Sequence, residues 1–257
     1  MESKNSVLEL WDERATLLES AGTNDLIAKQ LEITELTSHV RDGMKVLEIG
    51  CGNGITAIEI AKRFAVTIQA FDFSESMIEA AKKLAGGEQF KGSVDFRVGD
   101  VRHMPELKNQ FDLVITERVL INLPDWETQA RAIQEISGYL APGGRYLMCE
   151  NSQDGLDQIN DLREQAGLKR ISPPWHNCYF REEKINSLRI PEMLLAEVRC
   201  YSSTYYFLSR LVNAWLAHQE GREPAYDAAI NQLALLLPPI AQFGQGKLWI
   251  WEKSFSQ

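Results

Sequence analysis

Cysteine and histidine are scarce in this chain of 257 residues, with four of each. The cysteines are scattered and form no C-x-x-C pair, which suits free thiols in a reducing cytoplasm. His103, His176 and His218 fall on no spacing that is typical of metal ligands. We therefore expect a cytoplasmic protein with no bound metal.

Long apolar runs are also lacking. No stretch approaches the ~18 apolar residues that a membrane-spanning helix needs. The most apolar run, residues 233–240, is short and contains Pro238-Pro239. The first residues, Met1-Glu-Ser-Lys-Asn, contain no apolar signal region. The sequence thus predicts neither a signal peptide nor insertion into a membrane.

Positively charged residues are outnumbered: the chain has 27 Lys and Arg but 36 Asp and Glu, which gives a net charge of −9. A protein that binds the nucleic-acid backbone needs clustered Lys and Arg, so the balance argues against that partner but leaves a local basic patch open. A hydrophobic content of 44% with 25% charged residues is ordinary for a soluble globular protein. The length fits one domain with an elaboration.

The most informative stretch is residues 46–54, VLEIGCGNG. Its first half predicts a buried strand, and its glycines permit a tight turn and close approach of a ligand to the backbone. The apolar residues that follow from Ile55 predict a helix that begins at once. A strand, a glycine loop and a helix N-terminus form the unit that holds nucleotides in doubly wound folds.

Two features distinguish this loop from the dinucleotide fingerprint G-x-G-x-x-G. Ile55 stands where a small residue is needed, and the third glycine comes one place early, at Gly54. Glu48 ends the strand, where a carboxylate would repel a pyrophosphate but would accept hydrogen bonds from ammonium and hydroxyl groups.

The segment from Glu48 to Gly54 resembles the first motif of class I S-adenosylmethionine (SAM)-dependent methyltransferases, E/D-x-G-x-G-x-G, at every fixed position. Glycines kept only for packing are the alternative. The resemblance implies that SAM is the methyl donor and S-adenosylhomocysteine (SAH) the product. It also assigns cofactor contacts to Glu48, Gly50, Cys51, Gly52, Asn53 and Gly54.

The order of the predicted elements agrees with that family. Alternating strands and helices from residue 44 imply an α/β fold with a doubly wound, mostly parallel, seven-stranded sheet. We expect strands at 45–49, 67–71, 93–98, 111–115, 144–150, 194–201 and 247–252. We expect helices within 6–41 and at 54–64, 75–85, 125–140, 155–167, 180–188, 204–218 and 224–237.

We interpret the chain as a single methyltransferase domain with three parts. Residues 1–43 would form an N-terminal helical lid and residues 44–150 the SAM-binding core. Residues 151–257 would form the acceptor half, with a helical cap at about 202–240 inserted between strands 6 and 7. A dimerisation surface is the alternative role for this insertion.

The resemblance extends to the ends of the next strands. Asp72, in a stretch similar to the family's D-x-S-x-x-M, is expected to accept the ribose hydroxyls, although it could instead cap the next helix. Asp100 would accept the adenine amino group, and the Thr116 carbonyl would face the methionine ammonium. Further predicted cofactor contacts are Phe73, Met77 (or a core role for it), Val101, and Trp11 and Arg14 from the lid.

The acceptor is harder to predict. Enzymes that methylate base nitrogens carry an N/D/S-P-P-Y/F/W tetrad after strand 4, but here Ser172-Pro173-Pro174-Trp175 comes well after strand 5. No cysteine stands where methyltransferases acting on pyrimidine carbon need a nucleophile. Both observations argue against a nucleic-acid acceptor. We expect a small-molecule or sugar-containing acceptor, methylated at oxygen, and a monomer or homodimer.

His176 is the leading candidate for the general base, followed by Glu150 and Tyr205. The predicted substrate-binding residues are Glu117, Arg118, Trp175, Tyr179, Tyr206 and Arg210. Three alternatives stay open: an N-methyltransferase of a small amine, a SAM-binding protein without catalysis, and a nicotinamide-dependent oxidoreductase. Glu48 and Ile55 disfavour the last.

Overall fold

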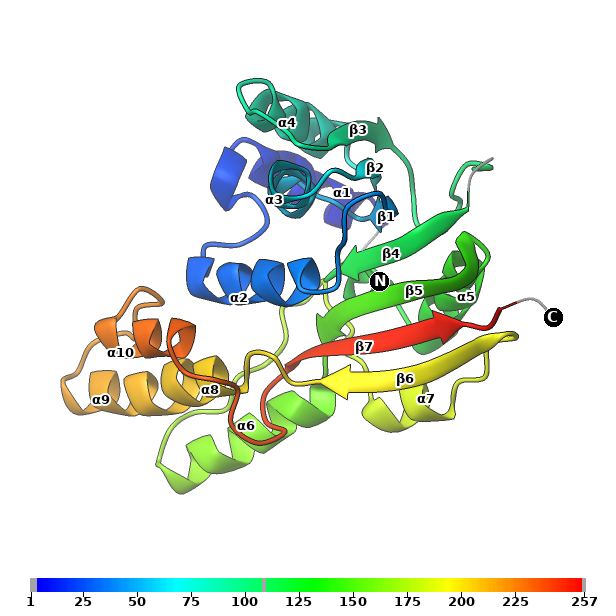
Figure 1. Cartoon of the computed structure of the whole chain (residues 1–257). Coiled ribbons are helices and arrows are strands. Elements are labelled where there is room, and N and C mark those ends of the chain that lie inside the picture. Colours follow the sequence, from blue (N-terminus) through cyan, green and yellow to red (C-terminus); the bar gives the residue numbers. More distant parts are fainter. Residues whose placement is uncertain (1–3, 108–109, 256–257) are drawn as a thin grey trace.

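A computed structural model describes residues 4–107 and 110–255 and shows one seven-stranded sheet with helices on both faces (Figure 1). The strand order is β3-β2-β1-β4-β5-β7-β6, and only β7 runs antiparallel to its neighbours. The strands are β1 (Lys45–Ile49), β2 (Thr67–Asp72), β3 (Ser93–Val98), β4 (Phe111–Glu117), β5 (Leu140–Asn151), β6 (Met193–Arg199) and β7 (Gly246–Lys253). The predicted fold class is confirmed.

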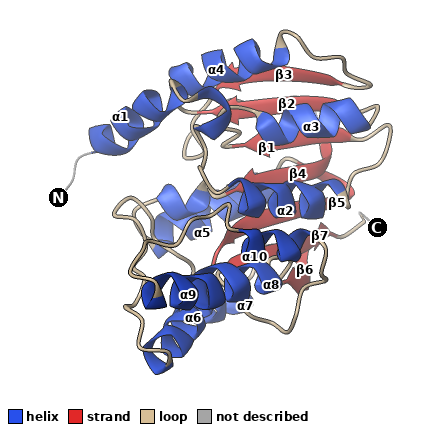
Figure 2. Ribbon diagram, turned by 90° about the vertical axis from the view of Figure 1, so that its left-hand side faces the viewer, coloured by secondary structure: helices blue, strands red, loops and turns tan. Residues whose placement is uncertain are grey.

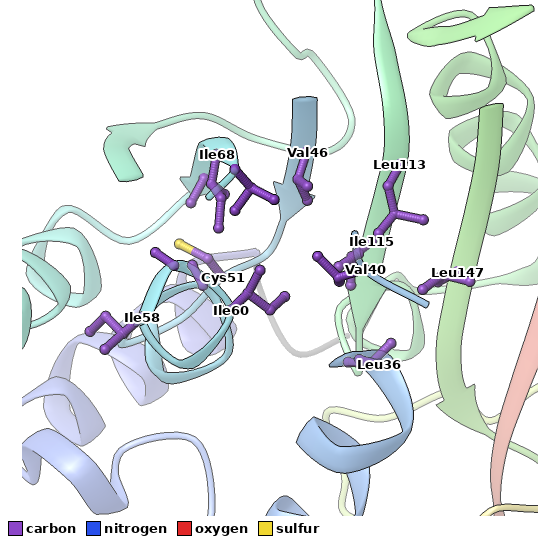
Figure 3. Close-up of a cluster of buried hydrophobic side chains, with 14 of the residues drawn as sticks. Leu36, Val40, Val46, Cys51, Ile58, Ile60, Ile68, Leu113, Ile115 and Leu147 are labelled. Atoms are coloured by element: carbon purple, nitrogen blue, oxygen red, sulfur yellow. The ribbon is translucent and has the colours of Figure 1, made fainter. Parts of the chain in front are cut away.

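Apolar side chains on both faces of the sheet determine where the helices pack. Helices α2 (Leu26–Thr37), α3 (Ile55–Arg63) and α4 (Glu75–Ala85) cover one face, as Figure 2 shows. Figure 3 shows the core beneath them, where Leu36 of α2 and Ile60 of α3 meet Val46 and Ile115 of the sheet. Helices α5 (Trp126–Ser137) and α7 (Glu182–Ser187) cover the other face.

The strand order reverses between β1 and β4, which are neighbours in the sheet but not in the chain. Ligands of open α/β folds bind at such a reversal, outside the carboxyl ends of the strands. The loops after β1, β2 and β4 converge there. Helix α1 (Lys4–Ala15) packs on α4 beside this edge.

Beyond β5, the chain forms α6 (Gln153–Gln165) and α7, and the insertion between β6 and β7 is helical. Helix α8 (Ser203–Tyr206), a π-helical segment (Phe207–Asn213) and α9 (Ala214–Gln219) follow one another without a break. Within the described ranges, every helix is too short or too polar to cross a bilayer.

Two predicted elements differ in the structure. The helix expected at 224–237 shrinks to α10 (Ala229–Gln232) and a 3₁₀ turn (Leu233–Leu235), because Asn231 holds the carbonyls of Ala225 and Tyr226 in an irregular turn. Residues 141–144 do not end a helix: α5 stops at Ser137, and these residues form an irregular bend inside β5.

Gly54, at the N-terminus of α3, is expected to tolerate no side chain. Its φ is +75°, and a Cβ would lie 2.6 Å from Phe96 and 2.9 Å from Ala81. A positive φ and overpacking each cost on the order of 1–3 kcal/mol, so Gly54→Ala should lower the free energy of unfolding by about 2 kcal/mol or more. Urea denaturation measures this loss. Gly87→Ala is the matched control, because open space surrounds Gly87; equal losses in both variants would contradict the packing argument.

Candidate active site

Three adjoining cavities lie over the carboxyl ends of β1, β2 and β4. The loop cavity, of about 90 Å³, is bounded by the glycine loop 50–53, Glu48 and Asp72. The edge cavity, of about 320 Å³, is bounded by residues 99–102 and 122–124, and it shares Gly50 and Phe73 with the loop cavity. The lid cavity, of about 280 Å³, lies between the start of α2, residues 174–179 and Tyr206.

The glycine loop has the backbone that the sequence implied. Gly50, Gly52 and Gly54 all have positive φ. A Cβ on Gly50 would lie 2.3 Å from the Val119 side chain, so only glycine fits between the loop and the turn after β4. The Asn53 amide donates to the Leu18 carbonyl at 2.6 Å, which ties the loop to the N-terminal segment. The N–H groups of Gly50 and Cys51 donate to the Phe71 carbonyl, so the loop is also tied to the end of β2.

Glu48 lies at the base of this cavity with a buried carboxylate. Its Oε2 has no hydrogen-bond partner among the described residues. Burial raises its pKa to about 8; the charge of Glu117 adds to the rise, and Lys29 opposes it. Buried polar atoms are normally paired, so an unpaired oxygen that lines a cavity indicates a ligand with a hydrogen-bond donor.

Asp72 joins the end of β2 to the glycine loop. Its carboxylate accepts hydrogen bonds from the Gly52 N–H at 2.8 Å and the Ser74 N–H at 3.0 Å. Burial raises its pKa to about 6, although these backbone bonds oppose the rise. Ser74, and not Asp72, caps α4, because its hydroxyl accepts from the Met77 N–H. Met77 is buried and also lines the loop cavity.

Phe73, Asp100 and Val101 line the edge cavity together. Arg102 holds the Asp100 carboxylate through its Nε at 2.8 and 3.0 Å. Burial raises the pKa of Asp100, but the hydrogen bonds and charge of Arg102 outweigh it and the pKa is lowered. The cavity thus offers an aromatic wall and an ionised carboxylate.

A buried network of charges connects α2 to the end of β4, and sequence reasoning missed half of it. Lys29 binds Glu117 and donates to the Thr56 hydroxyl at 2.9 Å. Arg118, which has a φ of +53°, lies 3.3 Å from Glu32 and 3.5 Å from Glu117. Burial raises the pKa of Glu117, but Lys29 and Arg118 outweigh burial and lower it. Burial raises the pKa of Glu32 to about 8.

Lys29 and Glu32 could have been found from their positions. They stand three apart on α2, between the apolar residues of the face that packs on the sheet. Charged residues inside such a face are unusual unless they are paired or face a ligand.

Thr116 lies apart from the three cavities. Its side chain is fully buried, and its hydroxyl bonds Tyr146 at 2.8 Å. The predicted contact of its carbonyl with the methionine ammonium stays a prediction.

His176 lies on the boundary between the edge cavity and the lid cavity and lines both. Trp11 and Trp175 meet its ring edge-on, with ring centroids 5.8 and 5.3 Å away. Burial, and then the charge of Arg14, lower its pKa, and its buried Nδ1 has no partner among the described residues. At neutral pH the imidazole is therefore uncharged and can accept a proton.

Most of the predicted acceptor residues meet around the lid cavity, which is lined by Arg118, Tyr179, Tyr206 and Arg210. Glu117 faces the loop cavity, and Trp175, which is half-exposed, faces the edge cavity. Arg210 binds Asp25 at 2.9 Å and lies 4.8 Å from the centre of the Tyr226 ring.

Trp11 and Arg14 lie beside adjoining cavities, and their contacts with the cofactor stay predictions. Trp11 lines the loop cavity and the lid cavity, as a residue covering the cofactor would. Arg14 lines the lid cavity alone, because its guanidinium is held by the carbonyls of Ser20 and Ala21.

Two of the three candidate bases are contradicted by their surroundings. Glu150 is buried beneath the turn after β4, where its oxygens accept the N–H groups of Val119, Leu120 and Ile121. The Tyr205 hydroxyl donates to Asp25 at 2.5 Å, and burial raises its pKa. Neither side chain lines any of the three cavities. His176 is the candidate that faces a cavity.

Comparison with known proteins agrees with this geometry. The sequence model of the methyltransferase domain family matches residues 40–193, which is more than half of the chain. The chain belongs to the class I SAM-dependent methyltransferases. The family uses SAM, and the matched region contains the glycine loop, Asp72 and Asp100.

Curated relatives from bacteria match about half of this chain. A demethylmenaquinone methyltransferase of Lactiplantibacillus plantarum is 35% identical over 136 residues, which are 52% of this chain and 55% of the relative. Methyltransferase GfsG of Streptomyces halstedii is 29% identical over 111 residues, 43% of this chain and 39% of that protein. The chain thus spans about half the length of the curated relatives it matches.

Solved structures share the fold of this methyltransferase domain. A putative methyltransferase in complex with the Haloferax volcanii activator Trm112 gives a TM-score of 0.60 at 17% identity, with 99% of each chain covered. The [4+2]-cyclase SpnF gives 0.56 at 24% identity, covering 88% of this chain and 81% of that one. The N-methyltransferase NodS of Bradyrhizobium japonicum, bound to SAH, gives 0.51 at 16% identity, covering 88% and 84%.

Proposed function

We propose that the protein transfers a methyl group from SAM to an oxygen of a small polar acceptor held in the lid cavity. One observation carries the proposal: His176, with a free and buried Nδ1, lies on the wall between the cavities suited to the donor and the cavity suited to the acceptor. In this proposal residues 1–43 act as lid, 44–150 as donor core and 151–257 as acceptor half.

The loop and edge cavities fit the donor's chemical groups. The unpaired Oε2 of Glu48 suits a hydrogen-bond donor, and the open space beside Gly52 admits a ligand against the backbone. Asp72, already fixed by two backbone N–H groups, has lone pairs left for the ribose hydroxyls. Phe73 offers a face for the adenine ring and Asp100 an acceptor for its amino group.

Asp72→Asn is expected to weaken SAH binding about 30-fold, because an amide replaces one acceptor oxygen and turns an N–H group toward backbone donors. Isothermal calorimetry measures the dissociation constant. Asp227→Asn, on the exposed surface of the insertion, is the matched control and should bind as the wild type does. If both variants keep wild-type affinity, Asp72 does not hold the ribose.

In the proposed reaction SAM supplies a methyl group on a sulfonium, which is already activated for in-line displacement. The protein's share is to position the acceptor and to remove its proton. His176 Nδ1 accepts the hydroxyl proton as the oxygen attacks, and the imidazole becomes imidazolium. Trp11 and Trp175 exclude water from this ring by packing on its edges.

The walls of the lid cavity support a small or sugar-containing acceptor. Amide side chains line it together with two tyrosines, and this mixture suits hydroxyl-rich molecules: the amides are Asn24, Asn122, Asn151, Asn177 and Gln245. The acceptors named for the relatives do not carry over, because the whole insertion between β6 and β7 lies outside the matched residues 40–193. A cytoplasmic location and a monomer or homodimer remain predictions.

The test begins with calorimetry of SAM, SAH and NADH, followed by mass spectrometry of mixtures with panels of alcohols and amines. Binding of SAM and SAH, with methylated alcohols as products, is the expected result. Methylated amines alone would overturn the oxygen assignment. Donor binding without transfer to either panel would favour a non-catalytic SAM-binding protein. Binding of NADH in place of SAM would favour an oxidoreductase.

A further inference from the structure

The lid cavity is rich in positive charge, although the protein as a whole carries a net charge of −9. Three guanidinium groups line it, from Arg14, Arg118 and Arg210, against the carboxyl groups of Asp25 and Glu32. Arg210 is neutralised, because it binds Asp25 at 2.9 Å. The excess therefore lies at Arg14 and Arg118.

Arg14 is held in place by neutral groups only. Its Nε donates to the Ala21 carbonyl at 2.6 Å and its Nη2 to the Ser20 carbonyl at 3.2 Å. Among the described residues, no carboxylate lies within 4.0 Å of its guanidinium, and Nη1 donates to no protein group. The turn Leu18–Ser20 thus fixes the orientation of this arginine without cancelling its charge.

Arg118 is half-buried and incompletely paired. Its Nε is inaccessible to solvent and makes no hydrogen bond, even though Glu32 lies 3.3 Å away. Glu32 has a pKa raised to about 8 by burial, so at neutral pH it is mostly uncharged. Glu117, the other neighbour, also binds Lys29. Burial, and then the charge of Arg118, lower the pKa of Arg14, as expected for two like charges with no anion between them.

The donor's own carboxylate has other cations available. Lys29 and Arg118 both line the loop cavity, where the amino-acid end of SAM is proposed to lie, and Arg118 lines the lid cavity as well. Arg14 lines the lid cavity and not the loop cavity. An anion beside Arg14 would therefore enter with the acceptor.

We propose that the methyl acceptor carries a carboxylate, which binds between Arg14 and Arg118 at the floor of the lid cavity. Arginine is suited to this contact because its planar donors match a carboxylate and its charge does not titrate near neutral pH. The inference rests on the proposed function, since it concerns the acceptor of that reaction. It narrows the acceptor to hydroxy acids and uronic acids and excludes neutral sugars.

The test compares three acids with their neutral methyl esters: 4-hydroxybenzoate, 3-phenyllactate and D-glucuronate. Calorimetry with SAH at saturation gives each dissociation constant. The wild-type protein should bind at least one acid about 10-fold or more tightly than its ester, as one charge-assisted contact allows. Arg14→Gln should bring that ratio close to one, whereas Arg14→Lys should keep most of it. Arg41→Gln, an exposed arginine, is the matched control.

Three results would overturn the inference. Equal affinity for acid and ester in every pair would show that the cavity does not select for charge. If Arg14→Gln and Arg14→Lys lose the preference for acid over ester to the same extent, then Arg14 acts by stabilising the turn and not by its charge. If Arg14→Gln loses as much affinity for SAH as for the acid, then Arg14 binds the carboxylate of the methyl donor and not that of the acceptor. Failure of the wild type to bind SAH at all would instead contradict the proposed function.

Discussion

Replacing Glu48 with glutamine is expected to weaken SAH binding about 100-fold or more. A charge-assisted hydrogen bond is worth about 1.5–3 kcal/mol, and the glutamine NH2 group would also face the hydrogen-bond donor of the ligand. Glu48 is the buried acid at the centre of the loop cavity, and its Oε2 has no protein partner to replace the lost contact. Calorimetry with SAH measures the effect. Glu79→Gln, an exposed glutamate of α4, should leave the affinity unchanged. An unchanged affinity in Glu48→Gln would remove Glu48 from the donor site.

The same substitution should stabilise the unliganded protein at high pH. The pKa of Glu48 is about 8 in the folded state, against an ordinary value of 4.5. Between these values the folded state keeps a proton that the unfolded state has released, so stability falls as the pH rises toward 8. Glutamine has no such proton to lose. Urea denaturation should find Glu48→Gln similar to wild type near pH 4.5 and more stable above pH 8.

The second large effect is expected from His176→Gln, which should lower kcat about 100-fold, a typical contribution of a general base, while leaving the SAH affinity within about threefold. Glutamine keeps a polar side chain of similar reach but cannot take the proton. The assay uses an acceptor identified in the panel and follows product by mass spectrometry. His218→Gln is the control, because His218 is exposed in the last turn of α9.

The pH profile separates a chemical role of His176 from a structural one. The pKa of His176 is lowered from its ordinary value of 6.5, and only the neutral imidazole accepts a proton. In the wild type, kcat should therefore rise with pH to an inflection below 6.5 and then level off. His176→Gln should lack this rise. A variant that is slow but keeps the wild-type inflection would contradict the assignment.

The sequence was sufficient for most of the fold because its signals are local. The strands at 45–49 and 93–98 and the helix at 75–85 have the predicted bounds, since apolar period and turn residues mark both ends of each. The bend inside β5 was missed because Pro142 and two glycines normally end an element, whereas here the strand resumes beyond them.

The residues of the candidate site also fall into those with a local sequence signal and those without one. Glu48, Asp72 and Asp100 could be located because they lie at or just after the ends of strands, and the ends of parallel strands meet at one edge. Glu150 also lies at the end of a strand, yet its carboxylate accepts three N–H groups of the turn after β4. Lys29 and Glu32 reach the site through the packing of α2 on the sheet; their place on its apolar face indicated a special role, but their partners are set by the folded chain. The surroundings of Glu150, Lys29 and Glu32 are thus set by contacts between segments that are distant in the sequence.

Asp25 has a consequence for how the site opens. This carboxylate accepts the Ala28 N–H at the start of α2, the Tyr205 hydroxyl of α8 and the Arg210 guanidinium of the π-helical segment. The N-terminal helices and the insertion between β6 and β7 are thus joined by polar contacts here, and Ile27 of α2 also packs in one apolar cluster with Tyr205 and Tyr206. Neither can swing away alone without breaking a buried ion pair and a buried hydrogen bond. We therefore expect the N-terminal helices and the insertion to move together, and not one at a time, when a ligand enters the site.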